Sequence, residues 1–171
     1  EGWKTWLIDN SQLTIDNSKG NHQSPIINCQ IPHNWDDYYG YRQLTHGNLH
    51  GTTMYVKDFS LDNCPLSTVN SQLKKRYFLR FEGVGTYATI KVNGHDFGRY
   101  PVGRTTLTLD VTNALKQGTN RLEVKAEHPE MIADMPWVCG GCSSEWGFSE
   151  GSQPLGIFRP VVLEATDEIR I

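Results

Sequence analysis

Hydrophobic and polar side chains alternate along the segment from Lys75 to Ala126. The repeating buried-type positions fall on every second residue, which is the period of a strand with one face in a core and one in water. Four such runs follow one another, so the pattern predicts antiparallel strands. Their inward positions are Tyr77, Leu79 and Phe81; Ala88, Ile90 and Val92; Thr105, Leu107, Leu109 and Val111; and Leu122, Val124 and Ala126.

Two turn signals separate these runs. Asn93-Gly94 follows the second run, and both residues adopt positive φ at little cost, so the pair predicts a tight hairpin. The segment 113–117 predicts one helical turn, with Thr112 or Asp110 as its N-cap and Gly118 as its C-terminal stop. The runs are therefore joined by short connections.

The rest of the chain adds strands at both ends. Residues 3–13 predict an opening strand, 16–24 a polar loop, 55–59 another strand and 157–163 a closing strand. The total is about eight or nine strands with almost no helix and no internal repeat. We therefore predict an all-β fold, a β-sandwich with Greek-key or jelly-roll connections.

The segment 128–154 interrupts the alternation. It contains Trp137, Trp146, Glu145 and Glu150 among glycines and serines, and is too aromatic for a linker. An ordered loop longer than about 15 residues in a compact domain is usually a lid or a binding loop. The two tryptophans could stack on sugar rings or could anchor the loop to the domain.

Composition and charge narrow the function. A chain of 171 residues is long enough for one domain with its own core, and its net charge of −3 gives no basic stripe for phosphates. Nucleic acid and anionic membrane are therefore poor partners, and a neutral ligand fits better. No apolar run reaches the roughly 18 residues that span a bilayer. The first residues do not resemble a signal peptide, which leaves open whether one was removed.

The cysteines do not predict a metal or redox cofactor. Cys139 and Cys142 are close in sequence, but Cys29 and Cys64 lie 35 positions apart, so half of a zinc signature is missing. A reactive Cys-x-x-Cys pair begins a helix, whereas Cys142 is followed by two serines. We interpret the pair as part of a structural loop, either reduced or closed by a disulfide.

An ordered set of motifs spans nearly the whole chain. Together they resemble the N-terminal sugar-binding domain of glycoside hydrolase family 2, a galactose-binding-domain-like jelly roll, and the similarity is greatest to β-galactosidases. The motifs are Pro32-His-Asn-Trp35, Gly51-x-x-x-Tyr55-x-Lys57-x-Phe59, Phe78-Leu-Arg-Phe-Glu-Gly-Val84, Val92-Asn-Gly94, Phe97-Gly98, Leu109-Asp-Val-Thr112 and Gly156-Ile-Phe-Arg-Pro160.

The resemblance implies a larger parent enzyme. In this family an immunoglobulin-like domain and a (β/α)₈ barrel follow the sugar-binding domain, and the barrel carries both carboxyl groups of the retaining reaction. Residues 1–171 are then a single non-catalytic domain that forms one wall of the sugar subsite and a docking platform for the barrel. The resemblance further implies a bacterial parent that is periplasmic or secreted and that could form a homo-oligomer.

The resemblance also assigns two sugar-binding residues. In β-galactosidases of the family, the Asn before the Trp of Pro-x-Asn-Trp and an acid six positions before the Gly of Gly-Ile-Phe-Arg bind the terminal sugar. These positions are Asn34 and Glu150 here, where Glu replaces the usual Asp. A carboxylate accepts hydroxyl donors, and an amide both donates and accepts. Alternatively, Asn34 caps a turn and Glu150 is a solvated loop residue.

Two other functions compete with this one. A free-standing carbohydrate-binding module would share the sandwich and bind sugar without a barrel. Unaided hydrolysis would require two carboxylates to converge in one cleft of this chain. The residues encoded after Ile171 would distinguish these alternatives.

Overall fold

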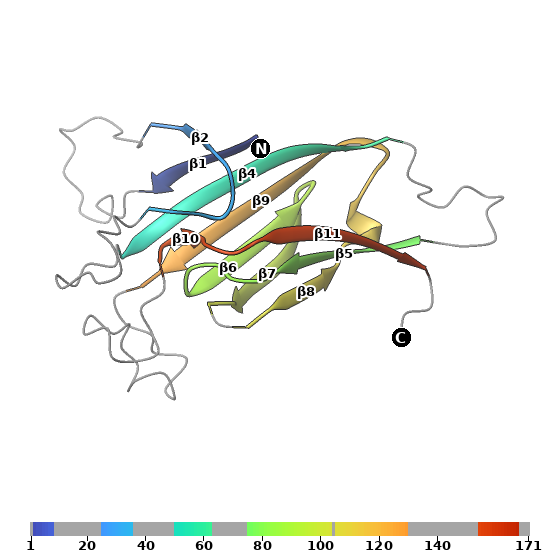
Figure 1. The fold of residues 1–171 in the computed structure, drawn as a ribbon. Coiled ribbons are helices and arrows are strands. Elements are labelled where there is room, and N and C mark those ends of the chain that lie inside the picture. The colour runs from blue at the N-terminus through green and yellow to red at the C-terminus, as the bar shows by residue number, and fades with distance from the viewer. Residues whose placement is uncertain are drawn as a thin grey trace.

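The chain folds into two facing layers of antiparallel strands (Figure 1). The computed structural model describes residues 2–8, 25–35, 50–62, 75–103, 105–129 and 154–167. The larger sheet has six strands in the order β2-β1-β4-β9-β6-β7. Its strands are β1 (Trp3–Ile8), β2 (Ile27–Cys29), β4 (Gly51–Leu61), β6 (Tyr87–Val92), β7 (His95–Pro101) and β9 (Gly118–His128).

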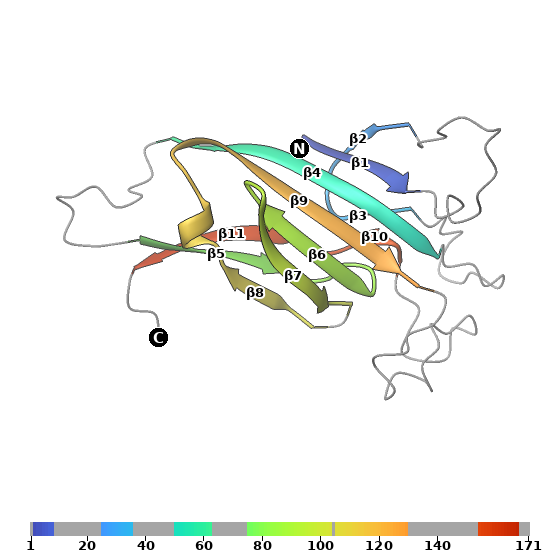
Figure 2. The ribbon, with the colours of Figure 1, turned by 180° about the vertical axis from the view of Figure 1, so that it is seen from behind.

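The second layer is smaller. Three strands, β5 (Lys75–Phe81), β8 (Leu107–Asp110) and β11 (Val161–Asp167), pair in the order β11-β5-β8. Two very short strands, β3 (His33–Asn34) and β10 (Gly156–Ile157), pair with each other. Seen from behind, β5, β8 and β11 lie below the long β4 and β9 strands (Figure 2). The predicted β-sandwich is thus confirmed.

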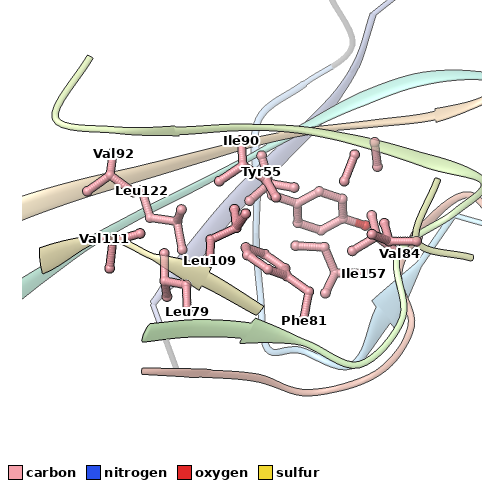
Figure 3. Close-up of a cluster of buried hydrophobic side chains, with 14 of the residues drawn as sticks. Tyr55, Leu79, Phe81, Val84, Ile90, Val92, Leu109, Val111, Leu122 and Ile157 are labelled. Atoms are coloured by element: carbon pink, nitrogen blue, oxygen red, sulfur yellow. The ribbon is translucent and has the colours of Figure 1, made fainter. Parts of the chain in front are cut away.

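The core lies between the layers and is built largely from the inward positions that the alternation predicted, but Thr105 is exposed and lies outside β8. Leu79 and Phe81 of β5 face Ile90 of β6 and Leu122 of β9, and all four are at most 2% exposed. Figure 3 shows these side chains interdigitating across the sandwich. Burial of a side chain of this size contributes roughly 1.5 to 3 kcal/mol, so the cluster is a major source of stability.

The predicted hairpin is present. β6 and β7 pair across a two-residue turn, with φ of 51° at Asn93 and 82° at Gly94. Each of the four predicted runs contains a strand, but the third is shorter than predicted, because β8 excludes Thr105 and Val111.

The predicted helical turn differs in type and position. It is a 3₁₀ turn over Thr112–Ala114, preceded by Val111, and Asp110 accepts hydrogen bonds from the backbone N–H of Thr112 at 3.0 Å and from its hydroxyl at 2.6 Å. Gly118 does not stop this turn, because the turn ends earlier and Gly118 begins β9 with φ of 79°. Gly118 thus has the positive φ that is typical of a glycine at a helix C-terminus, but it lies at the start of a strand.

The closing strand is two strands. Ile157 of β10 pairs with β3, whereas β11 begins at Val161 and pairs with β5. Pro160 separates them because it has no N–H to donate to a ladder. Among the described residues, no helix is long and apolar enough to cross a membrane.

Candidate functional site

Asn34 lies in the β3–β10 strand pair at one end of the sandwich. Its backbone is opposite Gly156, and the N–H of the next residue, Trp35, donates to the carbonyl of Leu155 at 2.9 Å. The Asn34 side chain is half-buried. The backbone of the Pro-His-Asn-Trp motif is therefore paired with the Gly-Ile-Phe-Arg motif.

Gly156 permits this close approach. A Cβ at this position would lie 2.5 Å from the Tyr55 hydroxyl, 2.6 Å from the His33 carbonyl oxygen and 2.8 Å from Asn34 Cα. Its φ of +144° is also one that other residues rarely adopt. Glycine is required here both by space and by backbone conformation.

Gly85 supports β10 from the opposite side. Its N–H donates to the carbonyl of Gly156 at 2.7 Å, and a Cβ on Gly85 would lie 2.8 Å from the Pro154 carbonyl oxygen. β10 is thus enclosed between β3 and the segment that leads into β6.

His33 is anchored by a tyrosine of the large sheet. Its Nδ1 lies 2.8 Å from the hydroxyl of Tyr55, and the two rings meet edge to face with centroids 5.7 Å apart. Burial lowers the pKa of His33, which favours the neutral ring. Burial raises the pKa of Tyr55 far above its usual value, so this hydroxyl keeps its proton.

Trp35 is anchored on the other side of Asn34. Its indole N–H donates to the hydroxyl of Thr5 at 3.3 Å, and that oxygen lies 3.1 Å from the hydroxyl of Thr53. Thr53 in turn donates to the carbonyl of Trp6 at 2.9 Å. Both neighbours of Asn34 are therefore fixed to the large sheet by side-chain hydrogen bonds, and Trp35 packs against the core.

A histidine pair lies at the same end of the large sheet. His128 ends β9, His50 precedes β4, and their rings are 4.9 Å apart between centroids. His128 is fully buried, and its Nδ1 lies 3.3 Å from the hydroxyl of Thr86. Burial, reinforced by His50, lowers the pKa of His128 to about 4. The sequence gave no signal for this pairing.

The carboxylates in the described ranges lie on the outer surfaces of the sheets and form surface contacts. All except Asp62, which accepts from Ser60 at 2.7 Å, form ion pairs with Lys or Arg. The pKa of Asp110 is lowered, with hydrogen bonds from Thr112 and Arg76 outweighing its burial. Within the described ranges, no group of three His, Cys, Asp or Glu side chains is arranged to hold a metal ion.

Most of the other predicted site residues lie outside the described part of the chain. These are Glu150, Trp137 and Trp146, together with the cysteines Cys64, Cys139 and Cys142. The remaining cysteine, Cys29 of β2, is a free thiol whose pKa is raised by burial. Of the predicted sugar-binding residues, the structure therefore places Asn34.

Sequence reasoning missed two residues beneath Asn34. Tyr55 was recognised as a strand residue, and Thr5 lies in the opening strand, but neither was assigned to the site. Thr5 alternates with Trp3 in the sequence, and a polar residue on the inward face of a strand is the signal that could have identified it, since buried polar groups are normally hydrogen-bonded.

A family model described as glycosyl hydrolase 2 galactose-binding domain-like matches residues 33–135, more than half of the chain. A beta-glucuronidase of Bacteroides fragilis is 34% identical over 95 residues, covering 55% of this chain and 12% of that protein. The chain spans 9% to 12% of the length of the curated relatives that it matches.

Solved structures of glycosidases are also similar to this chain, over nearly its full length. A beta-glycosidase from Bacteroides vulgatus has a TM-score of 0.62 and 26% identity, covering 98% of this chain and 20% of that one. A beta-glucuronidase from glycoside hydrolase family 2 has a TM-score of 0.63 and 25% identity, covering 97% of this chain and 17% of that one.

Proposed function

The chain belongs to the glycosyl hydrolase 2 galactose-binding domain-like family, and we propose that it serves a larger glycoside hydrolase as a non-catalytic wall of the terminal-sugar subsite. On this proposal, the carboxyl groups that act on the glycosidic bond belong to a barrel outside residues 1–171. A retaining reaction would place these two groups about 5 Å apart in that barrel.

The observation that carries the proposal is the immobilised position of Asn34. Its backbone pairs with Gly156, and its neighbours His33 and Trp35 are hydrogen-bonded to Tyr55 and Thr5. A site that must orient a sugar hydroxyl benefits from a side chain whose backbone does not move. The amide of Asn34 can donate to one sugar oxygen and accept from a neighbouring hydroxyl.

The substrate class that we propose rests on the named relatives. Two of them are beta-glucuronidases, whereas the sequence motifs alone favoured β-galactosidases. We therefore propose a β-glucuronide, in preference to a β-galactoside, as the substrate of the parent. The two sugars differ at C6, where the glucuronide carries a carboxylate and the galactoside a hydroxymethyl group, and in the configuration of the C4 hydroxyl.

The test compares the full-length protein with this chain alone. Each is assayed with p-nitrophenyl β-D-glucuronide and p-nitrophenyl β-D-galactoside, and the anomer released first is identified by proton NMR. We expect the full-length protein to hydrolyse the glucuronide faster and to release the β-anomer, and the chain alone to hydrolyse neither.

Three outcomes would contradict parts of this proposal. Faster hydrolysis of the galactoside would reverse the substrate assignment, and initial release of the α-anomer would exclude retention. Absence of glycosidase activity in the full-length protein, with micromolar binding of a glycan by the chain alone, would identify a free-standing carbohydrate-binding module.

A further inference from the structure

We propose that the hydroxyl of Tyr55 is a positioning group for Asn34, acting by holding β3 and β10 together beneath the sugar subsite. The inference rests on the proposed function, because it assigns a residue to that same subsite. Tyr55 does not itself touch the sugar in this account. Its effect on substrate is transmitted through the backbone of His33 and Asn34.

Tyr55 is well placed to act as a fixed support. It lies in the middle of β4, which pairs with β1 on one side and with β9 on the other. Its side chain is fully buried, and its ring packs edge to face with Trp3 at 6.4 Å. Figure 3 shows the ring within the core, close to Ile157 and Phe81, with its hydroxyl directed towards Val84. A side chain held in this way has little freedom to follow movements of β3.

One oxygen atom contacts both short strands. The Tyr55 hydroxyl lies 2.8 Å from His33 Nδ1 and 3.4 Å from the His33 carbonyl oxygen on β3. The backbone of Ile157 on β10 faces the same hydroxyl and partly offsets the rise in its pKa. Gly156 of β10 lies against the same oxygen, since a Cβ on Gly156 would be only 2.5 Å from it. The hydroxyl is thus the point at which β3, β10 and the large sheet meet.

The hydroxyl, and not only the ring, is needed for this role. Strands of two residues have few ladder hydrogen bonds of their own, so their position depends on contacts with neighbours. Tyr55→Phe would keep the ring in the core but would leave His33 Nδ1 and the His33 carbonyl oxygen without this partner. We expect β3 to move more freely and Asn34 to be correctly placed for a smaller part of the time.

The first experiment measures steady-state kinetics of the full-length Tyr55→Phe variant with the p-nitrophenyl glycoside that the native protein cleaves. Loss of one net hydrogen bond predicts an increase in KM of about 3- to 10-fold with kcat nearly unchanged. A purely structural defect would instead reduce the active fraction, and so the apparent kcat, without changing KM. The matched control is Tyr77→Phe, a buried tyrosine of β5 in the other sheet, which should leave KM unchanged.

A double-variant cycle tests whether Tyr55 acts through Asn34. In the Asn34→Ala background, Tyr55→Phe should produce little further increase in KM, because the side chain that it positions is already absent. Full additivity of the two effects on KM would overturn the inference. His33→Gln, which removes the partner on the other side of the 2.8 Å contact, provides a second variant if Tyr55→Phe folds poorly.

A measurement independent of activity separates this inference from the proposed function. Hydrogen–deuterium exchange of the full-length protein follows the peptides that contain residues 33–35 and 156–157. Tyr55→Phe should speed their exchange several-fold while Tyr77→Phe does not. Unchanged exchange would overturn the positioning role even in an active glycosidase, and faster exchange in an inactive protein would uphold it while the proposed function fails.

Discussion

Because His128 is buried, we expect the folded chain to lose stability in mild acid. The side chain is fully buried at the end of β9, where its Nδ1 faces the Thr86 hydroxyl and its ring lies against His50. Its Nε2 has no hydrogen-bond partner within the part of the chain that the structure describes. A proton added to this ring would therefore place a charge in a site that offers it little compensation.

The magnitude follows from the two pKa values. Burial lowers the pKa of His128 from 6.5 to about 4 in the folded chain, so the unfolded chain binds a proton at a pH where the folded chain does not. Stability is then fully present above about pH 6.5 and falls as the pH approaches 4. At about 1.4 kcal/mol for each pH unit, the loss is about 3 kcal/mol in total and about 2 kcal/mol by pH 5.

Urea denaturation of this chain at intervals from pH 7.5 to pH 4.5 tests this prediction. His128→Gln should flatten the pH dependence by about 2 kcal/mol between pH 7.5 and pH 5. His95→Gln, at an exposed position after the β6–β7 turn, is the matched control for loss of one histidine. Subtracting the pH dependence of the free energy of unfolding of His128→Gln from that of wild type also removes the contribution of groups that both chains share, such as Asp110 and His33. An equal slope in wild type and His128→Gln would refute the reasoning.

Three further predictions concern a tightly packed glycine, the need for a metal or disulfide, and an acidic residue assigned from the sequence. Gly156→Ala should lower the free energy of unfolding by about 2 to 6 kcal/mol, because steric overlap with Tyr55 adds to backbone strain, whereas Gly94→Ala at an open position should cost about 1 to 3 kcal/mol; equal losses in urea titrations would contradict this. EDTA and a reducing agent should leave the melting temperature unchanged, and a drop with either would reveal a structural metal or disulfide. Glu150→Ala should reduce kcat/KM of the full-length protein about 10- to 100-fold, and its control Glu145→Ala should not; the reverse result would move the sugar-binding acid to Glu145.

Much of the fold could be predicted because the sequence patterns that specify its strands and hairpin involve residues close together in the chain. Alternation identified the inward faces of β5, β6 and β9, and the φ preferences of Asn93 and Gly94 identified the hairpin. These features depend on residues within a few positions of one another. The β-sandwich followed from their number and spacing.

The short strands could not be predicted in the same way. β3 and β10 contain two residues each, which is too few to show a period, and they pair across more than 120 positions of sequence. The closing strand was predicted as one because its apolar residues are continuous. Its division at Pro160 depends on Ile157 pairing in a different sheet.

The candidate site was predicted only in part, for a related reason. The motif resemblance identified Asn34, but the groups that hold it come from Thr5, Tyr55 and Gly156, which are distant in sequence. Their local patterns are those of ordinary strand residues. The roles of Asn34 and Glu150 in binding sugar remain predictions.

The central claim is that Asn34 binds the terminal sugar of a glycoside in the full-length protein. The most direct measurement is kcat/KM of Asn34→Ala with the preferred p-nitrophenyl glycoside, beside Asn28→Ala at an exposed position of edge strand β2. Loss of one or two hydrogen bonds to sugar hydroxyls predicts a decrease of about 10-fold or more for Asn34→Ala, with the melting temperature nearly unchanged. A decrease no larger than that of Asn28→Ala would contradict the account.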